Sequence, residues 1–292
     1  MLTAQEVLVL DRMTLSASGA TSSAHASGSR AARARGFGLE FRDFRRYQPG
    51  DDPRYIDWTI QARLRQLVVR EYRADGHLRL HLIIDTSLSM AAGTPDKLSC
   101  ARTLAALLSC VAARQGDALG LATFDATVRD VLEPVAGRAQ WHRVLHTLQS
   151  IQTAGASETN RALIDYGSTT VGPGLAVVIS DFFDEQGAFE GLQYLAHRRL
   201  MPAVIQVVAP EELDPALEDE AELVDVERPG TPGIVVDRHA VARYKDRLAR
   251  QANELAEFCT AHDMACTRVS SSMTFAELLR ACVDAGLLAS QG

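Results

Sequence analysis

Residues 79–90 read RLHLIIDTSLSM, an apolar run that ends in the pattern Asp-x-Ser-x-Ser. Large apolar residues fill most positions from Leu80 to Ile84, which is typical of a strand buried on both faces of a parallel sheet. Ligands of open α/β sheets bind at the carboxyl ends of the strands. Because Asp85, Ser87 and Ser89 begin where this strand should end, we expect them at a binding edge of the sheet.

These three side chains suit a hard cation. Carboxylate and hydroxyl oxygens favour Mg²⁺, Mn²⁺ or Ca²⁺ over softer metals. A single nearby carboxylate leaves a divalent cation under-neutralised, so the site would accept an acidic group from a partner. Helix capping and turn formation also place Ser and Asp at strand ends, and they are the alternative explanation for this cluster.

Two later stretches extend the pattern. Residues 155–163 read GASETNRAL, and residues 175–181 read LAVVISD, a second apolar strand that ends in Asp. Together the three stretches resemble the metal-ion-dependent adhesion site (MIDAS) of von Willebrand factor A-type domains, in which a loop Thr and a later Asp complete the Asp-x-Ser-x-Ser set. Ser157 stands where the family has Thr, and Thr159 is the alternative residue. The resemblance implies an Mg²⁺ or Mn²⁺ site, with Ca²⁺ as a further alternative, formed by Asp85, Ser87, Ser89, Ser157 and Asp181.

Residues 30–73 combine eleven Arg with aromatic residues and several carboxylates. A basic face with aromatic residues can bind nucleic acid. Alternating charges more often form internal pairs, because Arg binds carboxylates through two parallel hydrogen bonds. We favour internal pairing, and the net charge of −7 also argues against a protein that coats nucleic acid.

Within this segment, residues 36–58 read GFGLEFRDFRRYQPGDDPRYIDW. The string resembles the signature of the bacterial domain of unknown function 58 (DUF58) family. In that family the signature precedes a von Willebrand A-like domain. The signature positions are Gly36, Gly38, Glu40, Phe41, Arg45, Tyr47, Pro49, Gly50, Asp51, Asp52, Arg54, Asp57, Trp58 and Arg63. The resemblance implies an N-terminal segment over residues 1–76, packed on the core, and a von Willebrand factor A-like domain over residues 77–292.

The rest of the chain alternates apolar strands with helical patterns, which predicts an α/β fold with a mostly parallel sheet flanked by helices. A small β insertion is expected near residues 209–238. The expected strands are 67–72, 80–84, 117–124, 127–132, 175–180, 201–208 and 265–269. The expected helices are 3–15, 95–113, 141–151, 187–199, 239–262 and 275–285, with one more that follows the Ser157 loop and runs to about Thr170.

No run approaches the roughly 20 apolar residues that span a bilayer, and residues 1–15 do not resemble a signal peptide. The five Cys lack Cys-x-x-Cys spacing and are read as reduced core residues. Many relatives in the resembled family begin with two transmembrane helices, which this sequence lacks. We therefore expect a soluble, cytoplasmic protein without membrane attachment.

An enzyme would need a nucleophile with its base, or a hydrolytic metal with a general base. His81 lies inside the apolar run, and we expect it to pack in the sheet. His142 and His146 share one helix face, which we expect to be exposed. We therefore expect a non-enzymatic interaction module whose metal receives a carboxylate from a partner protein. The family resemblance implies a MoxR-type AAA+ ATPase as partner, in protein maturation or complex assembly. A metal-dependent phosphoester hydrolase and a nucleic-acid binder are the alternatives.

Overall fold

The computed structural model describes residues 3–16, 40–46, 68–73, 78–184, 187–215, 222–223, 234–235 and 238–290. The chain divides into two compact units. One comprises residues 1–22 and 78–292, and the other comprises residues 23–77.

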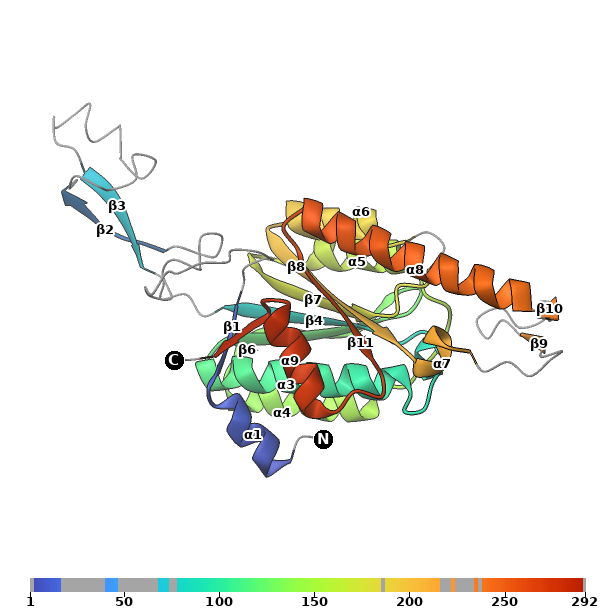
Figure 1. Cartoon of the computed structure of the whole chain (residues 1–292). Helices are drawn as coiled ribbons and strands as arrows, with labels where there is room; N and C mark the ends of the chain where they lie inside the picture. Colours follow the sequence, from blue (N-terminus) through green and yellow to red (C-terminus); the bar gives the residue numbers. More distant parts are fainter. Residues whose placement is uncertain are drawn as a thin grey trace. The chain divides into compact units, whose positions relative to one another are not determined.

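A six-stranded sheet forms the centre of the larger unit (Figure 1). Its strands lie in the order β11-β8-β7-β4-β5-β6, and all pairs are parallel except the edge pair β5–β6. The chain therefore starts in the middle of the sheet, winds to one edge, and returns to wind to the other. This doubly wound topology has its switch point between β4 and β7. The strands are β4 (Arg79–Asp85), β5 (Ala118–Phe124), β6 (Val128–Ala136), β7 (Gly174–Ser180), β8 (Leu200–Val208) and β11 (Ala265–Ser270).

Helices cover both faces of the sheet, as Figure 1 shows. One face carries α3 (Lys97–Gln115), α4 (Arg138–Ser150) and α9 (Phe275–Asp284). The other face carries α5 (Thr159–Thr169), α6 (Phe189–His197) and α8 (Arg238–Ala261). The expected α/β fold, with a mostly parallel sheet between helices, is confirmed.

Strand β4 is buried on both faces. Leu82 and Ile84 pack into the core beneath α3, whereas Ile83 packs into the core on the α5 side. Successive side chains of a strand point to opposite faces, so a strand covered on both sides needs apolar residues at nearly every position. This requirement explains the apolar run before Asp85.

The N-terminal helix is shorter than expected. Helix α1 (Ala4–Leu10) begins with a capping box formed by Thr3 and Glu6, and the chain then turns. Residues Met13–Leu15 form β1, which pairs antiparallel with β12 (Leu288–Ser290). The helix expected over residues 3–15 is therefore wrong beyond Leu10, because pairing with the C-terminal strand determines the conformation of the last three residues.

Residues 3–16 pack with the α/β unit. Leu10 is 1% exposed and lies in the core cluster that includes α3. This packing and the β1–β12 pairing join the start of the chain to the larger unit.

In the smaller unit, β2 (Glu40–Arg46) pairs antiparallel with β3 (Val68–Arg73), with an irregularity between Phe41 and Asp43. The backbones of Glu40, Phe41 and Arg45 lie in β2. The other signature residues lie outside the described residues, so internal pairing and nucleic-acid binding by this segment both stay predictions.

The expected β insertion is present. The short helix α7 (Pro210–Leu213) is followed by β9 (Glu222–Leu223) and β10 (Ile234–Val235), which pair antiparallel. None of the described helices has both the length and the apolarity that crossing a bilayer requires.

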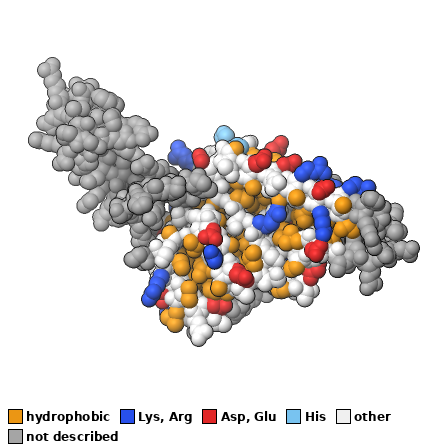
Figure 2. All heavy atoms as spheres, viewed as in Figure 1, with side chains coloured by type: hydrophobic (Ala, Val, Ile, Leu, Met, Phe, Trp, Pro, Cys, Tyr) orange, Lys and Arg blue, Asp and Glu red, His pale blue; other side chains and the backbone are white. Residues whose placement is uncertain are grey.

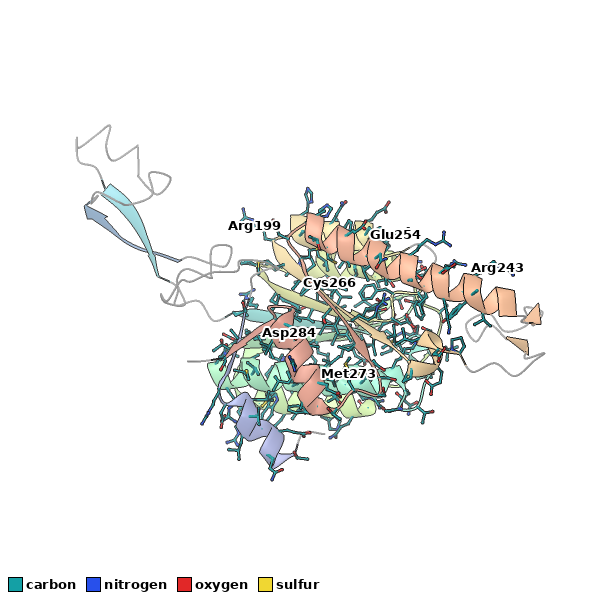
Figure 3. All side chains as sticks on the ribbon, viewed as in Figure 1. Arg199, Arg243, Glu254, Cys266, Met273 and Asp284 are labelled. Carbon is teal, nitrogen blue, oxygen red and sulfur yellow. The ribbon has the colours of Figure 1, made fainter. Side chains whose placement is uncertain are left out.

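Figure 2 shows acidic and basic side chains interspersed with apolar ones over the described part of the face in view. On α8, Arg243 and Glu254 lie along the exposed side of the helix, and Cys266 lies on β11 (Figure 3).

Candidate metal centre

The candidate site lies where β4 and β7 end side by side. The two strands pair in parallel, with Ile84 opposite Ile179. Asp85 is the last residue of β4, Ser180 is the last residue of β7, and Asp181 follows it. The structure therefore places the expected polar residues at the carboxyl edge of the sheet, at the switch point where open α/β folds bind their ligands.

Two backbone hydrogen bonds tie a second loop to the loop after β4. The N–H of Leu88 donates to the carbonyl of Gly155 at 2.9 Å, and the N–H of Ala154 donates to the carbonyl of Thr86 at 2.7 Å. Gly155 has a φ of +68°, a conformation that glycine adopts without steric cost. These contacts bring the loop that carries Ser157 beside Asp85.

Asp85 is fully buried and accepts hydrogen bonds on both oxygens. The N–H of Ser87 donates to Oδ1 at 2.8 Å. The hydroxyls of Ser180 and Ser157 donate to Oδ2 at 2.6 Å and 3.1 Å. Residues far apart in the sequence thus converge on one carboxylate.

Further hydroxyls extend this group. The Oγ atoms of Ser87 and Ser89 lie 2.9 Å apart, and Ser157 Oγ lies 3.1 Å from Thr159 Oγ1. Ser157 contacts Asp85 directly, whereas Thr159 is fully buried and contacts Ser157. Ser89 and Ser157 are partly exposed, so this cluster of hydroxyls is reachable from solvent.

The environment of Asp85 disfavours its negative charge. Burial raises the pKa of the Asp85 carboxyl to about 7, and the nearby carboxylate of Asp181 acts in the same direction. Hydrogen bonds from Ser180 and Ser87 oppose the shift only in part. A bound divalent cation would supply the positive charge that this carboxylate lacks.

Asp181 has different partners from Asp85. Its Oδ2 accepts from the Lys97 ammonium at 2.7 Å, and its Oδ1 accepts from the N–H of Phe183 at 3.2 Å. Lys97 also donates to Glu212 Oε1 at 2.5 Å. Asp181 therefore belongs to a buried ion-pair group as well as to the edge of the candidate site.

The loop after Asp181 is held by side chains from two other elements. Gln206 of β8 donates to the carbonyl of Asp181 at 2.9 Å, and Gln251 of α8 donates to that of Phe182 at 2.8 Å. Phe182 has a φ of +56°, which is uncommon for a residue with a side chain. Asp184 in the same loop accepts from the N–H of Thr159 at 2.9 Å.

Reasoning from the sequence missed three of these residues. Ser180 lies directly before the expected Asp181. The sequence pattern assigns Ser180 to the apolar strand and not to the site. Lys97 and Glu212 carry no local signal, because Lys97 contacts Asp181 from 84 positions away and Glu212 contacts Lys97 from 115 positions away. For Lys97 the only indication in the sequence is rarity, since the chain has just two lysines.

The chemistry of the donors fits a hard cation bound mainly through hydroxyls. Within the described ranges, no three His, Cys, Asp or Glu side chains gather as a metal-binding group. The oxygens that do gather there belong to the Asp85 carboxylate and to the hydroxyls of Ser87, Ser89, Ser157, Thr159 and Ser180. Such donors suit Mg²⁺, Mn²⁺ or Ca²⁺ and not a thiophilic metal.

The histidines lie elsewhere. His81 is buried within β4, and its Nδ1 lies 2.8 Å from the Tyr166 hydroxyl. Burial, and secondarily the charge of Arg79, lowers the pKa of His81 to about 4. His142 and His146 are exposed on α4, as expected.

The sequence matches the family described as "Protein of unknown function DUF58" over residues 43–254. It is 31% identical over 196 residues to the uncharacterized protein Rv1480 of Mycobacterium tuberculosis and, equally, to the uncharacterized protein Mb1516 of Mycobacterium bovis. Each alignment covers 65% of this chain and 59% of the relative. The chain thus spans about three fifths of the length of the curated relatives it matches.

Solved structures with similarity include the conserved hypothetical protein BatB from Bacteroides thetaiotaomicron, with a TM-score of 0.47, 17% identity, and coverage of 71% of this chain and 96% of that one. Another is proximal thread matrix protein 1 from the mussel byssus, solved with a zinc-occupied MIDAS motif. Its TM-score is 0.37, its identity is 13%, and the match covers 46% of this chain and 38% of that one.

Proposed function

The chain belongs to the DUF58 family and has a von Willebrand factor A-like fold, and on this premise we propose that it is a non-enzymatic interaction module that binds a partner protein through a divalent cation. The observation that carries the proposal is the convergence of Asp85 with the hydroxyls of Ser87, Ser89 and Ser157 at the switch point of the sheet. Residues from two loops meet there, and of the histidines discussed above, His81 is buried within β4 and His142 and His146 are exposed on α4.

The charge of the site supports a partner with an acidic group. Asp85 accepts a hydrogen bond from the Ser157 hydroxyl, while both oxygens of Asp181 are engaged by Lys97 and the Phe183 N–H. A divalent cation held mainly by neutral hydroxyls keeps excess positive charge. Since Ser89 and Ser157 are partly exposed, a carboxylate from another protein could complete the coordination.

We propose Mg²⁺ or Mn²⁺ as the cation and a MoxR-type AAA+ ATPase as the partner, with the chain acting as an adaptor in the cytoplasm. The support for the partner is the resemblance of residues 36–63 to the signature of a family associated with such ATPases. The support for the ion is the oxygen-only donor set around Asp85.

The test is calorimetric titration of the purified chain with Mg²⁺ and Mn²⁺. Asp85→Asn should weaken Mn²⁺ binding at least about thirtyfold, because it removes the only charged donor among the proposed direct ligands. The matched control is Asp165→Asn, which alters an exposed carboxylate on α5 that pairs with Arg161. Equal Mn²⁺ affinity in the wild type and Asp85→Asn would contradict the metal assignment.

The partner is tested separately by capture of a purified MoxR-type ATPase on the immobilised chain. Capture should require Mg²⁺ or Mn²⁺, stop on addition of chelator, and fail with Asp85→Asn. Capture that chelator leaves unchanged would separate partner binding from the cation site.

A further inference from the structure

Lys97 is a fully buried cation beside the candidate site. Its Nζ lies 2.7 Å from Asp181 Oδ2 and 2.5 Å from Glu212 Oε1, and 4.9 Å from the centre of the Phe183 ring. Removing an ammonium group from water costs several kcal/mol, and its ion pairs often only offset that cost. A buried ion pair is therefore weak evidence for a purely stabilising role.

The position of Lys97 in α3 is a second argument against a purely stabilising role. It is the first residue of the helix, where the helix dipole disfavours positive charge. The helix start is already capped by Asp96, which accepts from the N–H of Ser99 at 2.7 Å. Neither helix capping nor the dipole explains a lysine here, whereas its two carboxylate partners do.

The contacts of Lys97 determine which carboxylate is available to a cation. Asp181 Oδ2 is held by the ammonium and Oδ1 by a backbone N–H, so both oxygens are already engaged. Asp85, in contrast, has hydroxyls as its side-chain partners, and these are the donors that would surround a cation. Lys97 thus makes the two neighbouring carboxylates different: it neutralises Asp181 and leaves Asp85 able to bind a cation.

We propose that Lys97 is a positioning residue that holds Asp181 out of direct coordination and thereby keeps the bound cation under-neutralised and receptive to an acidic partner group. This inference rests on the proposed function and adds the residue that tunes its charge. Without the ammonium, Asp181 would be free to turn to the cation, to bind it directly and to compete with the partner carboxylate. The chain would then hold the cation more tightly and bind an external carboxylate less well.

The experiment compares Lys97→Met with the wild type, using Mn²⁺ alone and then Mn²⁺ with acetate as a small carboxylate. Calorimetry should show Mn²⁺ affinity raised about tenfold in Lys97→Met, since a second carboxylate joins the first. At saturating Mn²⁺, the relaxation enhancement of the acetate methyl protons should fall by about half or more, because Asp181 occupies a coordination position.

Three further variants make the result specific. Lys245→Met is the matched control, because Lys245 is the other lysine of the chain and pairs with Asp214 at 2.5 Å on the surface; it should match the wild type in both measurements. The double variant Lys97→Met/Asp181→Asn should lose the gain in Mn²⁺ affinity. If circular dichroism shows that Lys97→Met does not fold, Lys97→Ala, which likewise has no donor for Asp181, is measured in its place.

The two proposals fail in different ways. Mn²⁺ binding to the wild type that depends on Asp85 but is unchanged by loss of the Lys97 charge overturns the role of Lys97 alone. Absence of Mn²⁺ binding to both the wild type and the Lys97 variants overturns the proposed function as well. Mn²⁺ binding that appears only when the Lys97 charge is removed overturns both proposals, because the wild type would then hold no cation for a partner group to reach.

Discussion

His81 shows how a polar residue can be tolerated within the central strand. Its Nδ1 contacts the Tyr166 hydroxyl, while its Nε2 is buried without a hydrogen-bond partner among the described atoms. A charged imidazole would be costly in this environment, which is why burial lowers its pKa to about 4. The core therefore holds the His81 imidazole in its neutral form.

Protonation of His81 should make the protein less stable in mild acid. The unfolded chain binds a proton near the ordinary pKa of about 6.5, whereas the folded chain binds it only near 4. The contribution of His81 to stability is fully present above pH 6.5 and is lost as the pH falls toward 4. By linkage the loss approaches roughly 3 kcal/mol. Urea unfolding across this pH range measures it.

The variant His81→Leu should flatten this pH dependence, because it removes the titrating group from the core. His142→Gln is the control, since His142 is exposed on α4. An unchanged slope in His81→Leu would show that other groups cause the acid sensitivity.

The residues of the candidate site differ in how far the sequence predicts them. Asp85, Ser87 and Ser89 form a short motif directly after an apolar strand, so local reasoning places them correctly at the sheet edge. The contact of Ser157 with Asp85 required the family resemblance, because a loop more than 70 positions away supplies it. The pairing of Lys97 with Asp181 has no local signal, since the residues around a lysine at a helix start do not distinguish a buried side chain from a solvated one.

At the scale of elements, periodicity predicts the long buried strands and helices better than the short strands near the two ends of the chain. Strands β4, β7 and β8 and helices α3 and α8 lie close to their expected ranges, because buried elements need a continuous or periodic apolar pattern. Strand β12 was not expected, and the residues of β1 were assigned to a helix. Three-residue strands carry too little pattern, and their pairing depends on the opposite end of the chain.

Helix α1 should stabilise the α/β unit through one buried side chain. Leu10 is 1% exposed against the core, whereas Leu8 of the same helix is 66% exposed. Leu10→Ala should lower the free energy of unfolding by about 2–4 kcal/mol through lost burial and a cavity. Leu8→Ala should change it by less than about 0.5 kcal/mol. Chemical denaturation of both variants gives the comparison, and similar values for the two would show that α1 does not pack as described.

At the scale of the molecule, the topology explains why the candidate site lies where it does. The chain leaves β4 toward one edge of the sheet through α3 and returns to the centre at β7, so loops from both halves meet at the ends of these strands. The same arrangement buries Asp85 beside Asp181 and leaves two carboxylates close together. Their mutual repulsion makes the folded state sensitive to any cation bound there.

Cation binding should therefore raise the thermal stability of the whole α/β unit. A ligand that binds only the folded state stabilises it by about 2.7 kcal/mol at one hundred times its dissociation constant. For a unit of this size, that corresponds to a rise in melting temperature of roughly 5–10 °C. Scanning calorimetry with Mn²⁺ and then with excess chelator measures the shift. Asp85→Asn should show almost no rise, because it lacks the charged ligand, whereas Asp165→Asn should respond as the wild type does. A rise of equal size in Asp85→Asn would mean that Mn²⁺ stabilises the protein from another place.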